Sequence, residues 1–190
     1  MLAQENQEGG QARKRDRQTH VNAAFDPGPV DLRRPTAIEC DLALPALGVT
    51  SGTLAPGTRV ASVGRSRLLV PLTTRSALTT LSPDFERLRA ACDRLGFLGC
   101  YAYSVPTPTG RVAARMFAPS IGVAEDIANA NSTACLAAHL AGQGISDIAV
   151  DMGDSLGSPS TITATAHHDA SGLRVHLSGA ADVTRSIRMP

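Results

Sequence analysis

Two adjacent carboxylates, Glu125 and Asp126, stand just before a short run of small polar residues and an alanine-rich segment. The run contains Asn129, Asn131 and Ser132, which are residue types that cap the first turn of a helix. Backbone N–H groups that the caps leave unpaired can bind a carboxylate or phosphate. A carboxylate beside such a bound anion, in a cleft, holds its proton more tightly, as a general acid or base must. Asp126 is therefore a candidate acid or base; the simpler alternative is that both acids only complement the helix dipole.

The segment that follows this polar run is predicted to be a helix over residues 132–143. Leu136, His139 and Leu140 follow the spacing of one helical face, while the alanines keep the other faces smooth. A helix with this composition can be buried on nearly all sides. We expect it to form the centre of the domain, with the polar run at its open end.

The chain as a whole is predicted to consist of strand hairpins separated by two helices, of which the helix at 132–143 is the second. A first helix is predicted at 82–96, because Ser82 can act as its N-cap and Pro83 suits its first position. Strands are predicted at 58–64, 67–72, 98–106, 111–119, 147–153, 160–168, 172–179 and 180–187. Strands joined in hairpins indicate the α+β class rather than a doubly wound parallel sheet.

Residues 1–40 differ from the remainder in composition. They show no hydrophobic period, mix both charges and add several prolines. This pattern predicts a disordered or loosely attached leader, followed by one domain over residues 41–190.

Charge and composition exclude several classes of function. The net charge is +1, the aromatic fraction is 3%, and no basic stripe is visible, so we expect neither nucleic acid nor a membrane as partner. The chain has no run of 18 apolar residues and no secretory signal, which predicts a cytoplasmic protein. The four cysteines form no C-x-x-C pair and have no histidine at zinc-ligand spacing, so we expect buried thiols and no metal site.

Two motifs in register resemble the second domain of the PhzF family of phenazine biosynthesis-like isomerases. In that family a strand ending in Phe-x-Pro leads to Gly-x-x-Glu-Asp-Pro-Ala, a polar turn and a buried helix. The stretch "ARMFAPSIGVAEDIANANSTACLAAHL" matches this motif at Phe117, Pro119, Gly122, Glu125, Asp126, Ala128, Asn129 and Asn131. The stretch "DMGDSLGSPSTITA" is similar to the family's Gln-Gly-x-x-x-Gly-Arg-Pro-Ser at Gly153, Gly157, Pro159 and Ser160. The resemblance covers residues 42–190.

The resemblance implies a diaminopimelate-epimerase-like fold, in which a curled, mostly antiparallel sheet wraps around a central helix. It implies cofactor-free proton transfer at a carbon of a small carboxylate substrate. The substrate carboxylate would be held by backbone N–H groups at the helix mouth. Carried over to this chain, Asp126 is the acid of the site. The anion clamp is formed by Asn129, Ala130, Asn131 and Ser132.

Some family features are replaced in this chain. Ile127, Ala130 and Ser158 stand where the family has Pro, Gly and Arg. The Ser-Glu-Thr acid/base motif and the Gly-His-Pro motif of the family's first domain are not found, so that domain is expected to be missing. Two hypotheses follow. The chain is an isomerase whose second half-site comes from a partner such as another copy in a homodimer, or it is a truncated, catalytically silent relative that acts as a binding or oligomerisation module.

Overall fold

A computed structural model describes residues 19–170 and 172–183. The strands are β1 (Thr19–Phe25), β2 (Asp31–Arg33), β3 (Arg59–Val63), β4 (Arg65–Leu72), β5 (Cys100–Ser104), β6 (Arg111–Ala118), β7 (Val123–Asp126), β8 (Asp147–Met152), β9 (Ser160–Asp169) and β10 (Gly172–Val183). The helices are α1 (Ala37–Leu47), α2 (Arg75–Thr79), α3 (Phe85–Leu95) and α4 (Ala130–Ala141), with short 3-10 turns η1 (Pro119–Ile121) and η2 (Asp154–Leu156). The strands predicted between residues 58 and 168 are confirmed within a few residues at each end.

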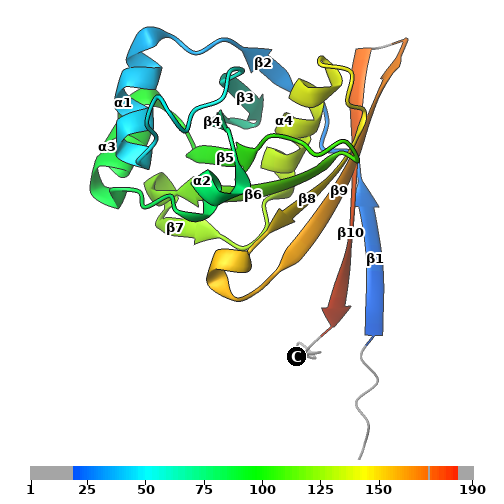
Figure 1. The fold of residues 1–190 in the computed structure, drawn as a ribbon. Helices are drawn as coiled ribbons and strands as arrows, with labels where there is room; N and C mark the ends of the chain where they lie inside the picture. The colour runs from blue at the N-terminus through cyan, green and yellow to red at the C-terminus, as the bar shows by residue number, and fades with distance from the viewer. Residues whose placement is uncertain (1–18, 171, 184–190) are drawn as a thin grey trace, which may run out of the picture.

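The strands form one curled sheet in the order β1-β10-β9-β8-β6-β5-β4-β3-β2, and β7 pairs with β6. The β4–β5 and β6–β8 pairs are parallel, while the other pairs are antiparallel. The sheet curls around α4, with the remaining helices on its outer side (Figure 1). This architecture confirms the predicted α+β class and the mostly antiparallel sheet wrapped around a central helix.

The core has two layers, one on each side of the sheet. In the inner layer, residues 132–140 of α4 are all buried against the inward side chains of the strands. In the outer layer, α1 and α3 pack on the opposite face through residues such as Leu47 and Leu88. The prediction of a helix buried on nearly all sides is confirmed, although α4 begins two residues earlier than expected, at Ala130.

The first predicted helix is confirmed as α3, but its start differs. Asp84, rather than Ser82, is the N-cap, and its side chain accepts a hydrogen bond from the backbone N–H of Arg87. Gly96 ends the helix in a left-handed conformation, with φ of 69°. The cap therefore lies two residues later than the sequence indicated, after the proline.

The prediction of a leader over residues 1–40 does not hold for residues 19–40; residues 1–18 lie outside the described part. β1 pairs along its length with β10, and β2 pairs with β3. α1 then begins at Ala37 with a capping box, in which Thr36 accepts from the N–H of Glu39 and Glu39 accepts from the N–H of Thr36. The ordered domain therefore begins before residue 41, and its boundary was misplaced because short edge strands carry little hydrophobic pattern.

The two strands predicted at 172–179 and 180–187 are one strand, β10, as far as Val183; residues 184–190 lie outside the described part. The predicted boundary between them fell at Gly179, but this residue lies within the strand, paired with Ala23 on one side and Ile162 on the other. A glycine flanked by two paired strands does not need to turn the chain.

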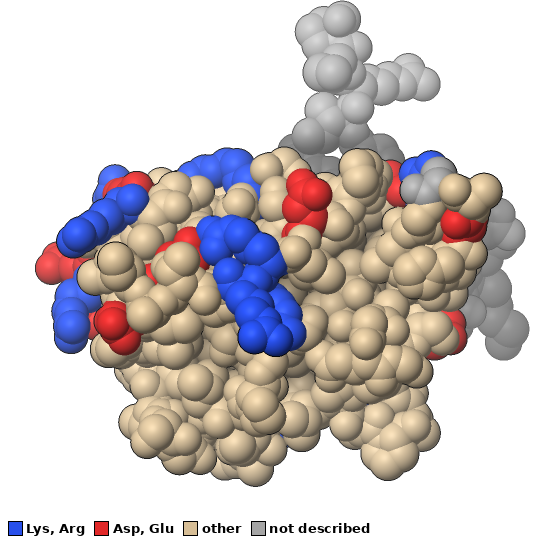
Figure 2. Space-filling view, turned by 90° about the horizontal axis from the view of Figure 1, so that it is seen from above, with Lys and Arg blue, Asp and Glu red and all other residues tan. Residues whose placement is uncertain are grey.

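The outer surface gives few indications of a partner. Seen from above, the molecule carries scattered side chains of both charges, and a broad part of this face carries neither (Figure 2). Among the helices of the described residues, none has the length and apolar character needed to cross a membrane.

Candidate functional site

The open end of α4 is built by the strand that leads into it. β7 pairs with β6 at Met116 and Asp126, and a short loop then brings the chain to Asn129. Asn129 is the N-cap: its Oδ1 accepts from the N–H of Ser132 at 2.9 Å, and its carbonyl accepts from the N–H of Thr133 at 3.0 Å. The first of these bonds satisfies one of the amide groups that a helix start leaves unpaired, and the second is the first hydrogen bond of the helix itself.

The two preceding amides of the first turn are free. The backbone N–H groups of Ala130 and Asn131 donate to no acceptor among the described residues. Ala130 is half-buried and Asn131 is exposed. Two unpaired N–H groups at the positive end of a helix dipole form a site for an anion.

Asp126 lies beside these amides. Its Oδ2 accepts a hydrogen bond of 3.0 Å from Nδ2 of Asn129, while Oδ1 has no hydrogen-bond partner among the described residues. The carboxylate is half-buried. The structure therefore brings Asp126, Asn129, Ala130 and Asn131 together as the sequence predicted, with one carboxylate oxygen left for another partner.

Ser132, the fifth predicted site residue, is differently placed. Its side chain is fully buried, and its N–H is taken by the Asn129 cap. Its Oγ accepts from Nη1 of Arg67 at 3.1 Å and donates to Sδ of Met116 at 3.5 Å. Ser132 is therefore not a free donor at the mouth, because both of its polar groups are engaged below it.

A layer of buried polar groups lies under the first turn of α4, and the sequence reasoning missed it. Tyr101, on β5, hydrogen-bonds Oγ1 of Thr133 at 3.0 Å and donates to Sδ of Met152 at 3.4 Å. Burial raises the pKa of the Tyr101 phenol, against the opposing effect of its bond to Thr133. Arg67, on β4, is 1% exposed. The available signal was the alternation of β4, which places Arg67 on the same face as the inward Leu69.

The loop of the second motif lies next to the mouth. Oγ of Ser160 donates to the carbonyl of Ile127 at 3.0 Å, which connects the start of β9 to the loop before α4. Gly153 begins the motif loop with φ of 78°, and its carbonyl accepts from the N–H groups of Leu156 and Ser158. The two motifs that were separate in sequence thus meet at one end of the curled sheet.

Glu125 faces away from the mouth. Nε and Nη2 of Arg115 each donate to its carboxylate at 2.8 Å, and Ser155 donates to it as well. Burial alone would raise the pKa of Glu125, but the hydrogen bonds from Arg115 and Ser155 and the Arg115 charge outweigh burial and lower it. This carboxylate is held ionised and has no access to the anion site.

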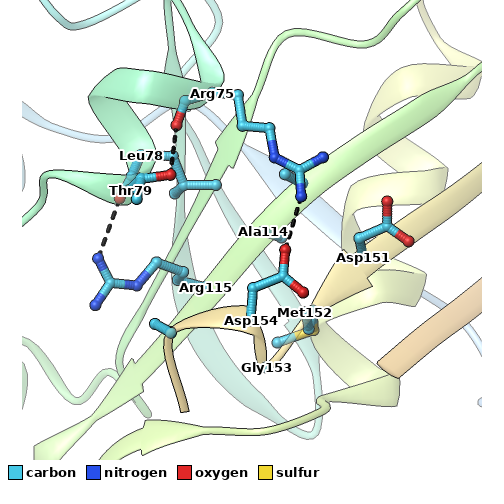
Figure 3. A pocket seen from close by; sticks show the side chains of 11 residues that line it. Arg75, Leu78, Thr79, Ala114, Arg115, Asp151, Met152, Gly153 and Asp154 are labelled. Carbon is cyan, nitrogen blue, oxygen red and sulfur yellow. Dashed lines mark hydrogen bonds and ion pairs between the residues drawn. The ribbon is translucent and has the colours of Figure 1, made fainter. Parts of the chain in front are cut away.

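A pocket of about 210 Å³ lies on the outer side of the sheet, between α2 and η2 (Figure 3). An ion pair of 2.7 Å between Arg75 and Asp154 stands at its edge, and Arg115 reaches from its wall to the carbonyl of Leu78. None of the five predicted site residues lines this pocket. The polar groups named here already have protein partners, so the pocket is a poorer candidate than the mouth of α4.

The remaining chemistry-bearing residues lie away from the mouth. His139 is 6% exposed in the second half of α4, where its Nε2 lies 2.9 Å from Nε2 of Gln143. Cys135 is buried in the same helix, and burial raises the pKa of its thiol to about 11. In the described part of the chain, no group of three or more His, Cys, Asp or Glu side chains is placed to hold a metal ion.

Comparisons with known proteins agree with this fold. The family model of phenazine biosynthesis-like proteins, PhzC-PhzF, matches residues 29–186, so the chain belongs to this family. Among solved structures, the PhzF-family protein of Bacillus anthracis superposes with a TM-score of 0.73 at 14% identity, covering 91% of this chain and 62% of that one. A predicted epimerase from Pseudomonas aeruginosa gives 0.65 at 25% identity, covering 87% and 59%.

Relatives in sequence carry isomerase names. The uncharacterized isomerase YddE of Escherichia coli K12 is 31% identical over 97 residues, which are 50% of this chain and 33% of that protein. The trans-2,3-dihydro-3-hydroxyanthranilate isomerase of Pseudomonas chlororaphis is 33% identical over 141 residues, which are 72% of this chain and 48% of that protein. The chain thus matches between a third and a half of the length of these two relatives.

Proposed function

We propose that this chain is an isomerase that transfers a proton at a carbon of a small carboxylate substrate in the cytoplasm. The observation that carries the proposal is the pairing of a half-buried carboxylate, Asp126, with the two free amides of Ala130 and Asn131. The isomerase names of its relatives and the family match support the same class of reaction.

The roles of the residues follow from this arrangement. The substrate carboxylate would accept hydrogen bonds from the Ala130 and Asn131 amides, where the helix dipole favours negative charge. Asp126 would then stand beside the reacting carbon and move the proton through its unpaired oxygen. Asn129 would hold the start of α4 and Asp126 in place, since its side chain caps the helix and donates to Asp126. The proposed step uses side chains and backbone groups, with no part for a cofactor.

Isomerisation takes a proton from one position and delivers a proton to another. One carboxylate can carry out both steps, but in the site proposed here a second acid or base takes one of them. We propose that a second copy of the chain supplies it, mouth against mouth in a homodimer. An exposed apolar side chain in the loop before α4 supports this: Ile127 is 46% exposed. Exposed apolar groups that rim a polar site favour association.

The test is deuterium incorporation in D₂O. The purified chain would be incubated with trans-2,3-dihydro-3-hydroxyanthranilate, and substrate and product would be followed by NMR. The proposal expects isomerisation with uptake of deuterium at carbon, and loss of both in Asp126→Asn. Turnover per chain that rises with protein concentration, alongside dimers in sedimentation, would support the shared site.

The alternative of a binding or oligomerisation module predicts a different outcome. Anthranilate would shift the amide signals of Ala130 and Asn131, yet no deuterium would enter the substrate at any protein concentration. That result would contradict the isomerase and leave the anion site intact. Absence of both signals would contradict the site itself.

A further inference from the structure

Arg67 is a buried cation without a counter-ion. It is 1% exposed, and none of the ion pairs among the described residues includes it. Its Nη2 donates to the carbonyls of Val63 at 3.2 Å and Arg65 at 2.8 Å, and its Nη1 donates to Oγ of Ser132. Its Nε is buried with no hydrogen-bond partner.

Such an arrangement is costly in the unliganded protein. A guanidinium stays protonated, so Arg67 cannot escape the cost by losing its charge. Neutral acceptors compensate a buried charge only in part, and a buried polar atom without a partner is rare. A neutral donor could bind the same two backbone carbonyls and the same hydroxyl. These contacts alone therefore do not explain why the buried side chain at position 67 is charged.

The groups around Arg67 are neutral. Burial is the main effect that lowers its pKa, and the titratable neighbours that oppose this effect are the thiol of Cys135 and the phenol of Tyr101, both buried. Ser132, which accepts a hydrogen bond from Arg67, belongs to the first turn of α4, whose dipole is also positive at this end. The positive charge of Arg67 and the positive end of the α4 dipole therefore lie together. The dipole ends at the free amides of Ala130 and Asn131.

We propose that Arg67 determines the charge specificity of the mouth of α4, making it select an ionised carboxylate over a neutral ligand of the same shape. The inference rests on the proposed function, since it takes the ligand to bind at Ala130 and Asn131. Arg67 does not touch the ligand. It acts through Ser132 and through its field, which is weakly screened in a buried environment. The bound anion supplies the negative counter-charge that Arg67 lacks among the described residues.

The test compares anthranilate with its neutral analogue anthranilamide. Dissociation constants would be measured from the amide shifts of Ala130 and Asn131 in the wild type, Arg67→Met, Arg67→Lys and Arg65→Met. Arg65 is the matched control, because it is exposed, lies two residues away and carries the same charge. The inference expects the preference for anthranilate to fall about tenfold in Arg67→Met, to return in Arg67→Lys, and to change little in Arg65→Met.

A purely structural role of Arg67 would give another result. The protein would lose stability in Arg67→Met while keeping its preference for the carboxylate, and that result would overturn the inference. An equal change in Arg65→Met would also overturn it, because net charge alone would then explain the effect. We expect Arg67→Met to fold, since replacing an unpaired buried charge by an apolar side chain is often neutral or stabilising. If neither Arg67→Met nor Arg67→Gln folds, the charge serves the fold, and the inference is wrong.

The outcomes separate this inference from the proposed function. A wild type that binds both compounds equally at Ala130 and Asn131 would overturn the role of Arg67 and leave the mouth as a binding site. A wild type that binds neither compound there would overturn both.

Discussion

Glu125 and Asp126 are neighbours in β7, yet their side chains have different partners on opposite sides of the sheet. Glu125 is bound by Arg115 on the outer side, whereas Asp126 is bound by Asn129 at the mouth of α4. Strand geometry imposes this alternation, so fixing one side chain orients the other. The ion pair on the outer side thus holds the strand that presents the site carboxylate.

The first prediction concerns this ion pair. Arg115 and Glu125 are 14% and 9% exposed, so Arg115→Met leaves a buried carboxylate without its cation. We expect a loss of about 3–5 kcal/mol in the free energy of unfolding, measured by urea denaturation. The double variant Arg115→Met with Glu125→Leu should recover part of the loss, because no charge is then left unpaired.

The control for this prediction is an exposed pair. Arg89 and Asp93 are 64% and 54% exposed on one helix face, at 3.8 Å. Arg89→Ala should change the stability by no more than about 0.5 kcal/mol. Equal losses in Arg115→Met and Arg89→Ala would show that the Arg115 pair is not a buried one.

The second prediction separates the two hydrogen bonds of the Asn129 side chain, the cap of α4 and the bond to Asp126. Asn129→Ala removes the cap of α4 and should lower the stability by about 1 kcal/mol. Asn129→Ser keeps a capping oxygen but removes the Nδ2 donor to Asp126, so its stability should stay within a few tenths of a kcal/mol. Under the proposed function, proton transfer should nevertheless fall in Asn129→Ser. A serine variant as active as the wild type would show that the bond to Asp126 is unimportant.

The sequence predicted those parts of the fold that depend on local pattern. The spacing of Leu136 and Leu140, with the capping residues before them, was enough to predict α4 and its polar mouth. The motif residues also predicted correctly that Asp126 and Asn129 come together. These features follow from short-range chemistry, which is read directly from neighbouring residues.

Other parts depend on contacts between distant segments, and these were missed. Arg67 reads as an ordinary polar residue at the start of a strand. The alternation of β4 indicates which face it lies on, but its burial depends on the closure of the sheet over α4. β1 has little pattern of its own and exists because β10 offers it an edge. The strand boundary predicted at Gly179 was wrong because the pairing with β1, which is remote in sequence, was not visible.

The third prediction uses two glycines of one loop. A Cβ on Gly153 would collide with the carbonyl of Ser158 and lie 3.1 Å from the carbonyl oxygen of Ile127, whereas a Cβ on Gly157 meets nothing within 4 Å. Both residues have positive φ, which alone costs an alanine about 1–2 kcal/mol. Gly157→Ala should lose about that much, and Gly153→Ala about 2–5 kcal/mol, because the clash adds to it. Thermal unfolding of both variants tests which one loses more stability. A larger loss in Gly157→Ala than in Gly153→Ala would contradict the prediction.

The fourth prediction concerns pH and the capping box of α1. Hydrogen bonds from Arg33, together with the amide of Thr36 and the Arg33 charge, outweigh burial and lower the pKa of Glu39 from 4.5 to about 2. A carboxyl group whose pKa is lower in the folded state stabilises the protein above its ordinary pKa. That stabilisation is lost as the pH falls from about 4.5 to 2. Because Arg33 is 51% exposed, water and salt screen the pair, and we expect about 1 kcal/mol.

The matched variant for this prediction is Glu39→Gln. Glutamine can still accept from the N–H of Thr36 in the capping box, so the substitution removes mainly the charge. The wild type should exceed Glu39→Gln in stability by about 1 kcal/mol at pH 7, measured by denaturation at low salt, and the difference should vanish near pH 2. Other carboxylates titrate in both proteins and cancel in the difference. A difference that stays constant from pH 7 to pH 2 would show that Glu39 acts through its shape rather than through its charge.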